Sequence, residues 1–87
     1  MFTVHSEFNS TVEIARANNY PNIRVFTVGE GGTTSATLLT QLGSIKQPWS
    51  VASAATIGVA DWTAFSAVCW HFGRNLFDAL GKTVPIG

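Results

Sequence analysis

FSAVCWHFGRNLFDAL, residues 65–80, carries the strongest secondary-structure signal in this chain. Apolar side chains recur there at the i, i+3, i+4 and i+7 spacing of one helical face; they are Phe65, Val68, Cys69, Phe72, Leu76, Ala79 and Leu80. Polar side chains repeat this spacing on the opposite face, at His71, Arg74, Asn75 and Asp78. Gly81 and Pro85 follow, and both residue types end helices. The pattern predicts an amphipathic helix whose apolar face packs on a core.

Cys69 and His71 raise the question of a thiol nucleophile with its base. Each helical residue turns about 100°, so side chains two positions apart point about 200° away from each other. The two groups therefore cannot form the hydrogen bond that activates a nucleophile. We expect Cys69 to be a packing cysteine, because free cysteine is among the most buried residue types. We expect His71 to be a surface or interface histidine, since no acidic partner is placed to orient it.

The first third of the chain predicts a helix followed by a strand. Ser10-Thr11-Val12-Glu13 fits a capping box, which places a helix over Ser10 to Asn18. Pro21 ends it, because the residue before a proline disfavours the helical region. Residues 23–28, IRVFTV, are β-branched and aromatic and predict a strand. The second half of this strand is apolar on both faces, which is typical of a parallel strand covered by helices.

Residues 29–62 give the weakest pattern. We expect an irregular excursion there, with a short helix over 36–42 and a loop around Gln47-Pro48-Trp49-Ser50. Val84-Pro85-Ile86-Gly87 has the character of the first residues of a second strand. The order of helices and strands predicts an α/β fold with a parallel sheet.

Length and composition indicate a single partial domain over residues 1–87. The chain is 46% hydrophobic and only 11% charged, whereas about 25% charge is usual for a soluble domain. Its net charge is zero, and its five basic residues are scattered, so we expect no nucleic-acid partner. No apolar run approaches the roughly 20 residues that span a bilayer. MFTVHSEFNS lacks the pattern of a signal peptide.

Two short motifs invite a catalytic or cofactor interpretation. His5-Ser6-Glu7 contains the three residue types of a catalytic triad, but adjacent residues cannot converge as triad members do. Gly29-Glu30-Gly31-Gly32 follows a strand, yet Thr34 stands where a dinucleotide loop needs its third glycine. We therefore expect no cofactor. The two distant histidines and one cysteine also lack metal-ligand spacing, so we expect no metal site.

Three further features leave alternatives open. Asn9-Ser10-Thr11 is an N-glycosylation acceptor triplet, although Asn9 and Ser10 could equally serve as helix caps. Trp49 and Trp62 lie in the excursion and could stack on a sugar ring or pack against the sheet. Trp70 is expected in the core.

Three of the stretches quoted above carry a family resemblance. FSAVCWHFGRNLFDALG followed by VPIG, together with NNYPNIRVFTVG and QPWSVAS, resembles the sialate O-acetylesterases and their bacterial relatives among carbohydrate esterases. The resemblance implies a flavodoxin-like, SGNH-hydrolase α/β/α domain of three layers with a parallel sheet, incomplete in this chain. It also implies acyl transfer from O-acetylated sialic acid or a related sugar to a serine, with histidine as base and aspartate as its orienter. Backbone amides and an asparagine form the oxyanion hole of the family.

The catalytic blocks of the family do not match residues of this chain. The nucleophile of the family lies in a Gly-Gln-Ser-Asn block followed by a methionine that Met1 resembles. The oxyanion glycine block of the family follows a VPIG-like strand. The resemblance thus implies an internal fragment between these blocks, with no catalytic residue; none of its serines matches the nucleophile (Ser6, Ser10, Ser44, Ser50, Ser53 and Ser66).

These implications define the functional expectations. We expect an inactive chain whose partner is the remainder of the esterase domain, and a secreted or lysosomal compartment for the whole enzyme. Ligands of doubly wound sheets bind at the carboxyl ends of strands, so residues 29–62 could border the substrate mouth. The alternatives are a non-enzymatic interaction module of this fold and a small sugar-binding module that uses Trp49 and Trp62.

Overall fold

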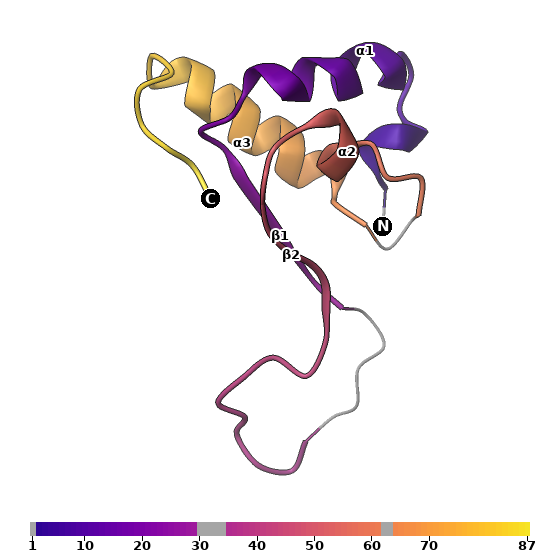
Figure 1. Ribbon diagram of the computed structural model, residues 1–87, viewed down its shortest axis with the longest axis vertical. Coiled ribbons are helices and arrows are strands. Elements are labelled where there is room, and N and C mark those ends of the chain that lie inside the picture. The colour runs from indigo at the N-terminus through magenta and orange to yellow at the C-terminus, as the bar shows by residue number, and fades with distance from the viewer. Residues whose placement is uncertain (1, 30–34, 62–63) are drawn as a thin grey trace.

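The computed structural model describes residues 2–29, 35–61 and 64–87. Two helices, α1 (Ser10–Arg16) and α3 (Ala67–Ala79), lie beside the base of a two-stranded ribbon (Figure 1). The ribbon consists of β1 (Arg24–Val28) and β2 (Ile45–Val51) and extends away from the helices. The short helix α2 (Ala54–Ile57) follows β2. Single 3-10 turns occupy Val4–Ser6 and Ala17–Asn19.

The first helix forms where the sequence predicts it, but its cap differs. Asn9 is the N-cap, in the left-handed region at φ 59°, and its side chain makes no capping hydrogen bond. The predicted capping box of Ser10 and Glu13 is therefore wrong, because the Glu13 carboxylate turns toward α3 instead. A reciprocal capping box does form at α2, where Ser53 accepts from the Thr56 amide and Thr56 accepts from the Ser53 amide.

The predicted strand at 23–28 is confirmed as β1, but the predicted parallel sheet is wrong. β1 pairs with β2 in antiparallel fashion, from Arg24 opposite Val51 to Val28 opposite Ile45. The register shifts twice along this pair, on either side of Thr27. In the described part of the chain, parallel pairing is limited to one isolated bridge between Ile23 and Ile86. The resulting fold is a small α/β unit, and its described residues do not form three layers.

The expectation for residues 29–62 is only partly correct. Residues 45–51 form β2 and residues 54–57 form α2, so this part is not irregular. Residues 36–42 form no helix and lie beyond the far end of the ribbon (Figure 1). Gly58 ends α2 where the chain passes α1, and a Cβ there would lie 2.5 Å from the Ala54 carbonyl oxygen. Glycine is required at this close approach.

The core lies between α1, α3 and the base of β1. Trp70 is its largest buried side chain, and the Tyr20 ring meets Trp70 and Phe77 edge-on, each at 5.8 Å between centroids. Val25 from β1 and Ile57 from α2 complete the cluster. Edge-on aromatic pairs stabilise beyond their buried area, by about 0.5–1.5 kcal/mol each. The expectation that Trp70 belongs to the core is confirmed.

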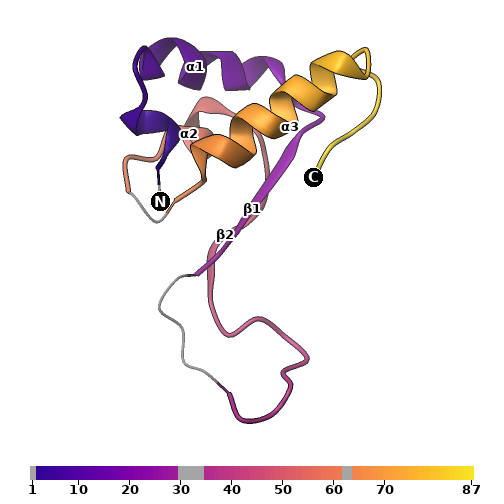
Figure 2. The same cartoon turned by 180° about the vertical axis from the view of Figure 1, so that it is seen from behind.

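The helix predicted at residues 65–80 is confirmed as α3, but the face expected in the core is exposed. Val68 is 74% exposed, Phe72 is 71% exposed, and Cys69 is exposed as well. The expectation of a packing cysteine is therefore wrong. The helix buries Ala67, Trp70 and Phe77 instead. In Figure 2, α1 and α3 lie next to each other at one end of the ribbon. Trp70 is directed to this contact, where its indole meets Glu13 of α1, whereas Cys69 and Phe72 lie on an open groove between α3 and β1.

Candidate functional site

A cluster of charged side chains joins α1 to α3 where the sequence pattern predicts a solvated helix face. Glu13 of α1 accepts a hydrogen bond from Trp70 Nε1 at 2.9 Å. Its Oε1 also lies 2.7 Å from Arg74 Nε, an ion-pair contact in which the N–H is not aligned for a hydrogen bond. Both side chains are nearly buried, at 11% and 13% exposure. The buried carboxylate is thus matched by the Trp70 indole, by Arg74, and on its exposed side by Arg16 at 3.4 Å, which compensates its charge.

The same cluster holds His71. Its Nε2 lies 2.7 and 2.8 Å from the two carboxylate oxygens of Glu7. Its Nδ1 lies 3.9 Å from Glu13 and 3.5 Å from Arg74. The expectation that His71 lacks an acidic partner is wrong, because folding brings Glu7 to it from 64 positions away. The interpretation of His71 as an interface histidine agrees with its place between two elements.

A second polar contact involves the C-terminal end of α3. The Tyr20 hydroxyl donates to both carboxylate oxygens of Asp78, at 3.1 and 3.0 Å. Arg74 Nη1 lies 3.6 Å from Asp78, so this residue is linked to the first cluster. These contacts hold α3 against the segment from α1 to β1.

Within the described part of the chain, this cluster lacks a nucleophile that His71 could activate. Among the described residues, the partners of His71 are two carboxylates and a guanidinium, and no hydroxyl or thiol lies in hydrogen-bond contact with it. A histidine base requires a nucleophile within about 2.6–3.2 Å. The three residues of the His5-Ser6-Glu7 motif also separate: Ser6 contacts the Thr3 hydroxyl at 3.2 Å, while Glu7 pairs with His71.

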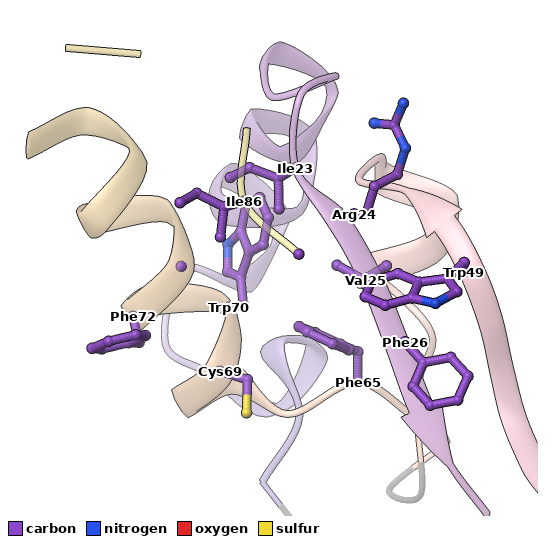
Figure 3. A pocket seen from close by; sticks show the side chains of 12 residues that line it. Ile23, Arg24, Val25, Phe26, Trp49, Phe65, Cys69, Trp70, Phe72 and Ile86 are labelled. Carbon is purple, nitrogen blue, oxygen red and sulfur yellow. The ribbon is translucent and has the colours of Figure 1, made fainter. Parts of the chain in front are cut away.

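An apolar groove of about 340 Å³ lies on the other side of α3, between this helix, β1 and the C-terminal residues (Figure 3). Phe65 lies in the middle of it, with Cys69 and Phe72 on the helix side. Trp49 from β2 stacks on Phe26 at 5.4 Å between ring centroids and stays 64% exposed. Arg24 is the one charged residue of the lining.

The remaining site predictions concern the glycosylation triplet, Trp62, the glycine-rich stretch and metal binding. Asn9 is exposed and its amide makes no capping bond, which leaves the acceptor triplet accessible. Trp62 lies outside the described residues, as do Glu30, Gly31 and Gly32 of the glycine-rich stretch. Over the described residues, no group of three or more His, Cys, Asp or Glu side chains could hold a metal ion. None of the described helices has the length and apolar character to cross a bilayer.

The sequence of the whole chain was compared with known proteins. No family model matches it. The sialate O-acetylesterases of rat and mouse are each 36% identical to it over 85 residues, which is 98% of this chain. Over nearly its whole length, the chain is thus similar to one stretch of the sialate O-acetylesterases. The human sialate O-acetylesterase is 33% identical over the same length. The chain spans about 15% of the length of the rat and mouse proteins and 16% of the human one.

The matched residues lie on both sides of α3. Because the match covers nearly all of the chain, it includes the α1–α3 cluster as well as the groove.

Proposed function

We propose that this chain forms one internal segment of a serine hydrolase that removes O-acetyl groups from sialic acid or a related sugar. The observation that carries the proposal is the match to sialate O-acetylesterases over 98% of this chain but only 15% of the relative. In such an enzyme a serine attacks the acetyl carbonyl and water then releases acetate. The complete domain would have the three-layer α/β/α architecture of SGNH hydrolases.

The segment would contribute structure rather than catalytic groups. Nucleophile, base and oxyanion donors would come from the remainder of the domain, which is the partner that we propose for this chain. Each missing group lowers the rate by orders of magnitude, so the isolated chain should be inactive. The exposed apolar face of α3 supports this proposal, because a complete domain would cover side chains such as Phe72.

Two further assignments accompany the proposal. Trp49, exposed on the groove, would border the substrate mouth in the complete enzyme; Trp62 is proposed for the same role from the sequence alone. A secreted or lysosomal compartment would allow Asn9 to carry a glycan, and its exposure is compatible with that modification.

A segment exchange tests the proposal. The 85 matched residues of the rat protein are replaced by the corresponding residues of this chain, and release of acetate from O-acetylated N-acetylneuraminic acid is measured. We expect a folded chimera with esterase activity. The matched control is the same chimera with Arg16→Ala, which alters an exposed side chain, 44% accessible, and should leave activity unchanged.

The isolated chain is tested beside it with 4-nitrophenyl acetate. Turnover above that of a heat-killed sample would overturn the proposed division of roles, and a folded chimera with no activity would overturn the proposal as a whole. The alternative, an interaction module without enzymatic function, predicts a folded oligomer of the isolated chain together with an inactive chimera.

A further inference from the structure

Arg24 differs from the other basic residues in its lack of a carboxylate partner within the described part of the chain. Each of the other four has a carboxylate oxygen at 3.8 Å or closer; they are Arg16, Lys46, Arg74 and Lys82. Arg24 Nη1 instead donates to the Pro21 carbonyl, and its Nε and Nη2 have no partner among the described residues. A guanidinium held at one nitrogen in this way still offers the pair of parallel N–H groups that binds a carboxylate.

Trp49 provides an aromatic surface beside Arg24. Its ring stacks on Phe26 and yet stays 64% exposed, so one ring face is covered and the other is open. A Cβ at Gly87 would lie 3.2 Å from the Trp49 ring and 3.6 Å from Arg24 Cβ, so the ring and the base of the Arg24 side chain are neighbours. Figure 3 shows both residues on the strand side of the groove.

These two side chains together have the chemistry of a site for an acidic sugar. The C–H face of a sugar ring packs on an exposed aromatic ring, and a carboxylate binds a guanidinium through two parallel hydrogen bonds. Small-molecule sites combine an apolar lining with a few polar groups, and Arg24 is the one charged residue of a groove of about 340 Å³. A neutral sugar would leave this charge unmatched, so the site favours a sugar that carries a carboxylate.

We propose that Arg24 and Trp49 bind an acidic sugar of the sialic acid class, with its carboxylate on Arg24 and one face of its ring on Trp49. The inference rests on the proposed function, in which Trp49 borders the substrate, and it makes Arg24 a specificity-determining residue of that enzyme. The site is confined to the strand side of the groove. The helix side, with Phe72, is the surface that the complete domain would cover.

The first test measures binding to the chain itself by tryptophan fluorescence at constant ionic strength. The ligands are N-acetylneuraminic acid and its methyl ester, which keeps the sugar ring and removes the charge. We expect the acid to bind about fivefold more tightly than the ester, the upper end for a solvent-exposed ion pair. Arg24→Gln should abolish this difference, whereas Trp49→Ala should weaken binding of acid and ester alike.

Two variants control for charge and for folding. Lys82→Gln removes one positive charge from an exposed side chain that does not line the groove, so the ratio of acid to ester binding should stay the same. Arg24→Lys keeps the charge without the planar fork and should retain only part of the preference. Arg24→Gln also removes the hydrogen bond to Pro21, but damage to the fold would weaken acid and ester alike and leave their ratio unchanged.

The second test measures the same preference in the chimera, as kcat/KM for acetate release from O-acetylated N-acetylneuraminic acid and from its methyl ester. We expect Arg24→Gln to lower kcat/KM for the acid about fivefold relative to the ester. Equal binding of acid and ester by the chain, or a ratio that Arg24→Gln leaves unchanged, would overturn the inference. An inactive chimera would overturn the proposed function instead, and the binding ratio of the chain alone would then decide the inference.

Discussion

Replacing Glu13 with alanine tests whether the buried contacts between α1 and α3 hold the structure together. The change leaves Arg74, 13% exposed, without its nearest carboxylate and removes the acceptor of the Trp70 indole. Removing one partner of a buried ion pair costs about 3–5 kcal/mol. An unsatisfied buried donor costs about 1–3 kcal/mol. These losses concern the same carboxylate, so they overlap and are not summed.

We expect Glu13→Ala to lower the free energy of unfolding by about 3 kcal/mol, the lower end of that range. The reason is that Arg74 keeps a second carboxylate, Asp78, at 3.6 Å. A domain of this length has a total stability of about 4–13 kcal/mol. The loss is therefore large enough to measure by urea denaturation followed with circular dichroism at 222 nm.

Arg16→Ala is the control, because Arg16 contacts the same carboxylate at 3.4 Å from the exposed side. Exposed ion pairs contribute about 0–1 kcal/mol, so this variant should unfold close to the original chain. Glu13→Gln keeps an oxygen for Trp70 but loses the charge, and should fall between the two. If Glu13→Ala and Arg16→Ala unfold within 0.5 kcal/mol of each other, roughly the limit of additivity for such comparisons, the reasoning about burial is refuted.

Three further experiments have specific expected results. Gly58→Ala places a Cβ 2.5 Å from a carbonyl oxygen of α2 and should destabilise the chain by about 1–3 kcal/mol in urea, whereas Gly43→Ala, with no neighbour within 4 Å, should not. Expression through a secretory pathway should add one glycan at Asn9, seen as a mass lost on treatment with an N-glycosidase; Asn9→Gln and Thr11→Ala should each abolish it, and an unchanged mass would contradict the assignment. In the active chimera, Trp49→Ala should lower kcat/KM for the acetylated sugar about three- to tenfold, the equivalent of a stacking energy near 1 kcal/mol, with no change for 4-nitrophenyl acetate.

Local sequence patterns predict the elements of this chain well where one short-range signal dominates. The helices at α1 and α3 and the strand β1 were all predictable, because periodicity and β-branched residues act over a few neighbouring positions. β2 was harder, since Pro48 lies inside it and a proline within an apolar run argues against a strand. Proline is tolerated on an edge strand, and whether a strand is an edge is a property of the sheet.

The orientation of α3 could not be predicted from its own pattern. Apolar periodicity identifies an apolar face, but burial of that face needs a covering element. In the described residues the covering helix is α1, and it brings Glu13 to the side of Arg74. The charged residues of α3 are drawn into the contact as a result, and Phe72 is left exposed.

The features of the candidate site also divide into those that the sequence predicts and those that only the folded structure shows. The sequence determined the family resemblance, the helix at 65–80 and the acceptor triplet at Asn9, because each depends on residue identity over short spacings. Only the tertiary structure decided that Glu7 pairs with His71, that β1 pairs antiparallel with β2, and that Cys69 and Gly73 line an open groove beside β1. Those contacts join residues far apart in the chain, and their partners are selected by packing, which no local pattern encodes.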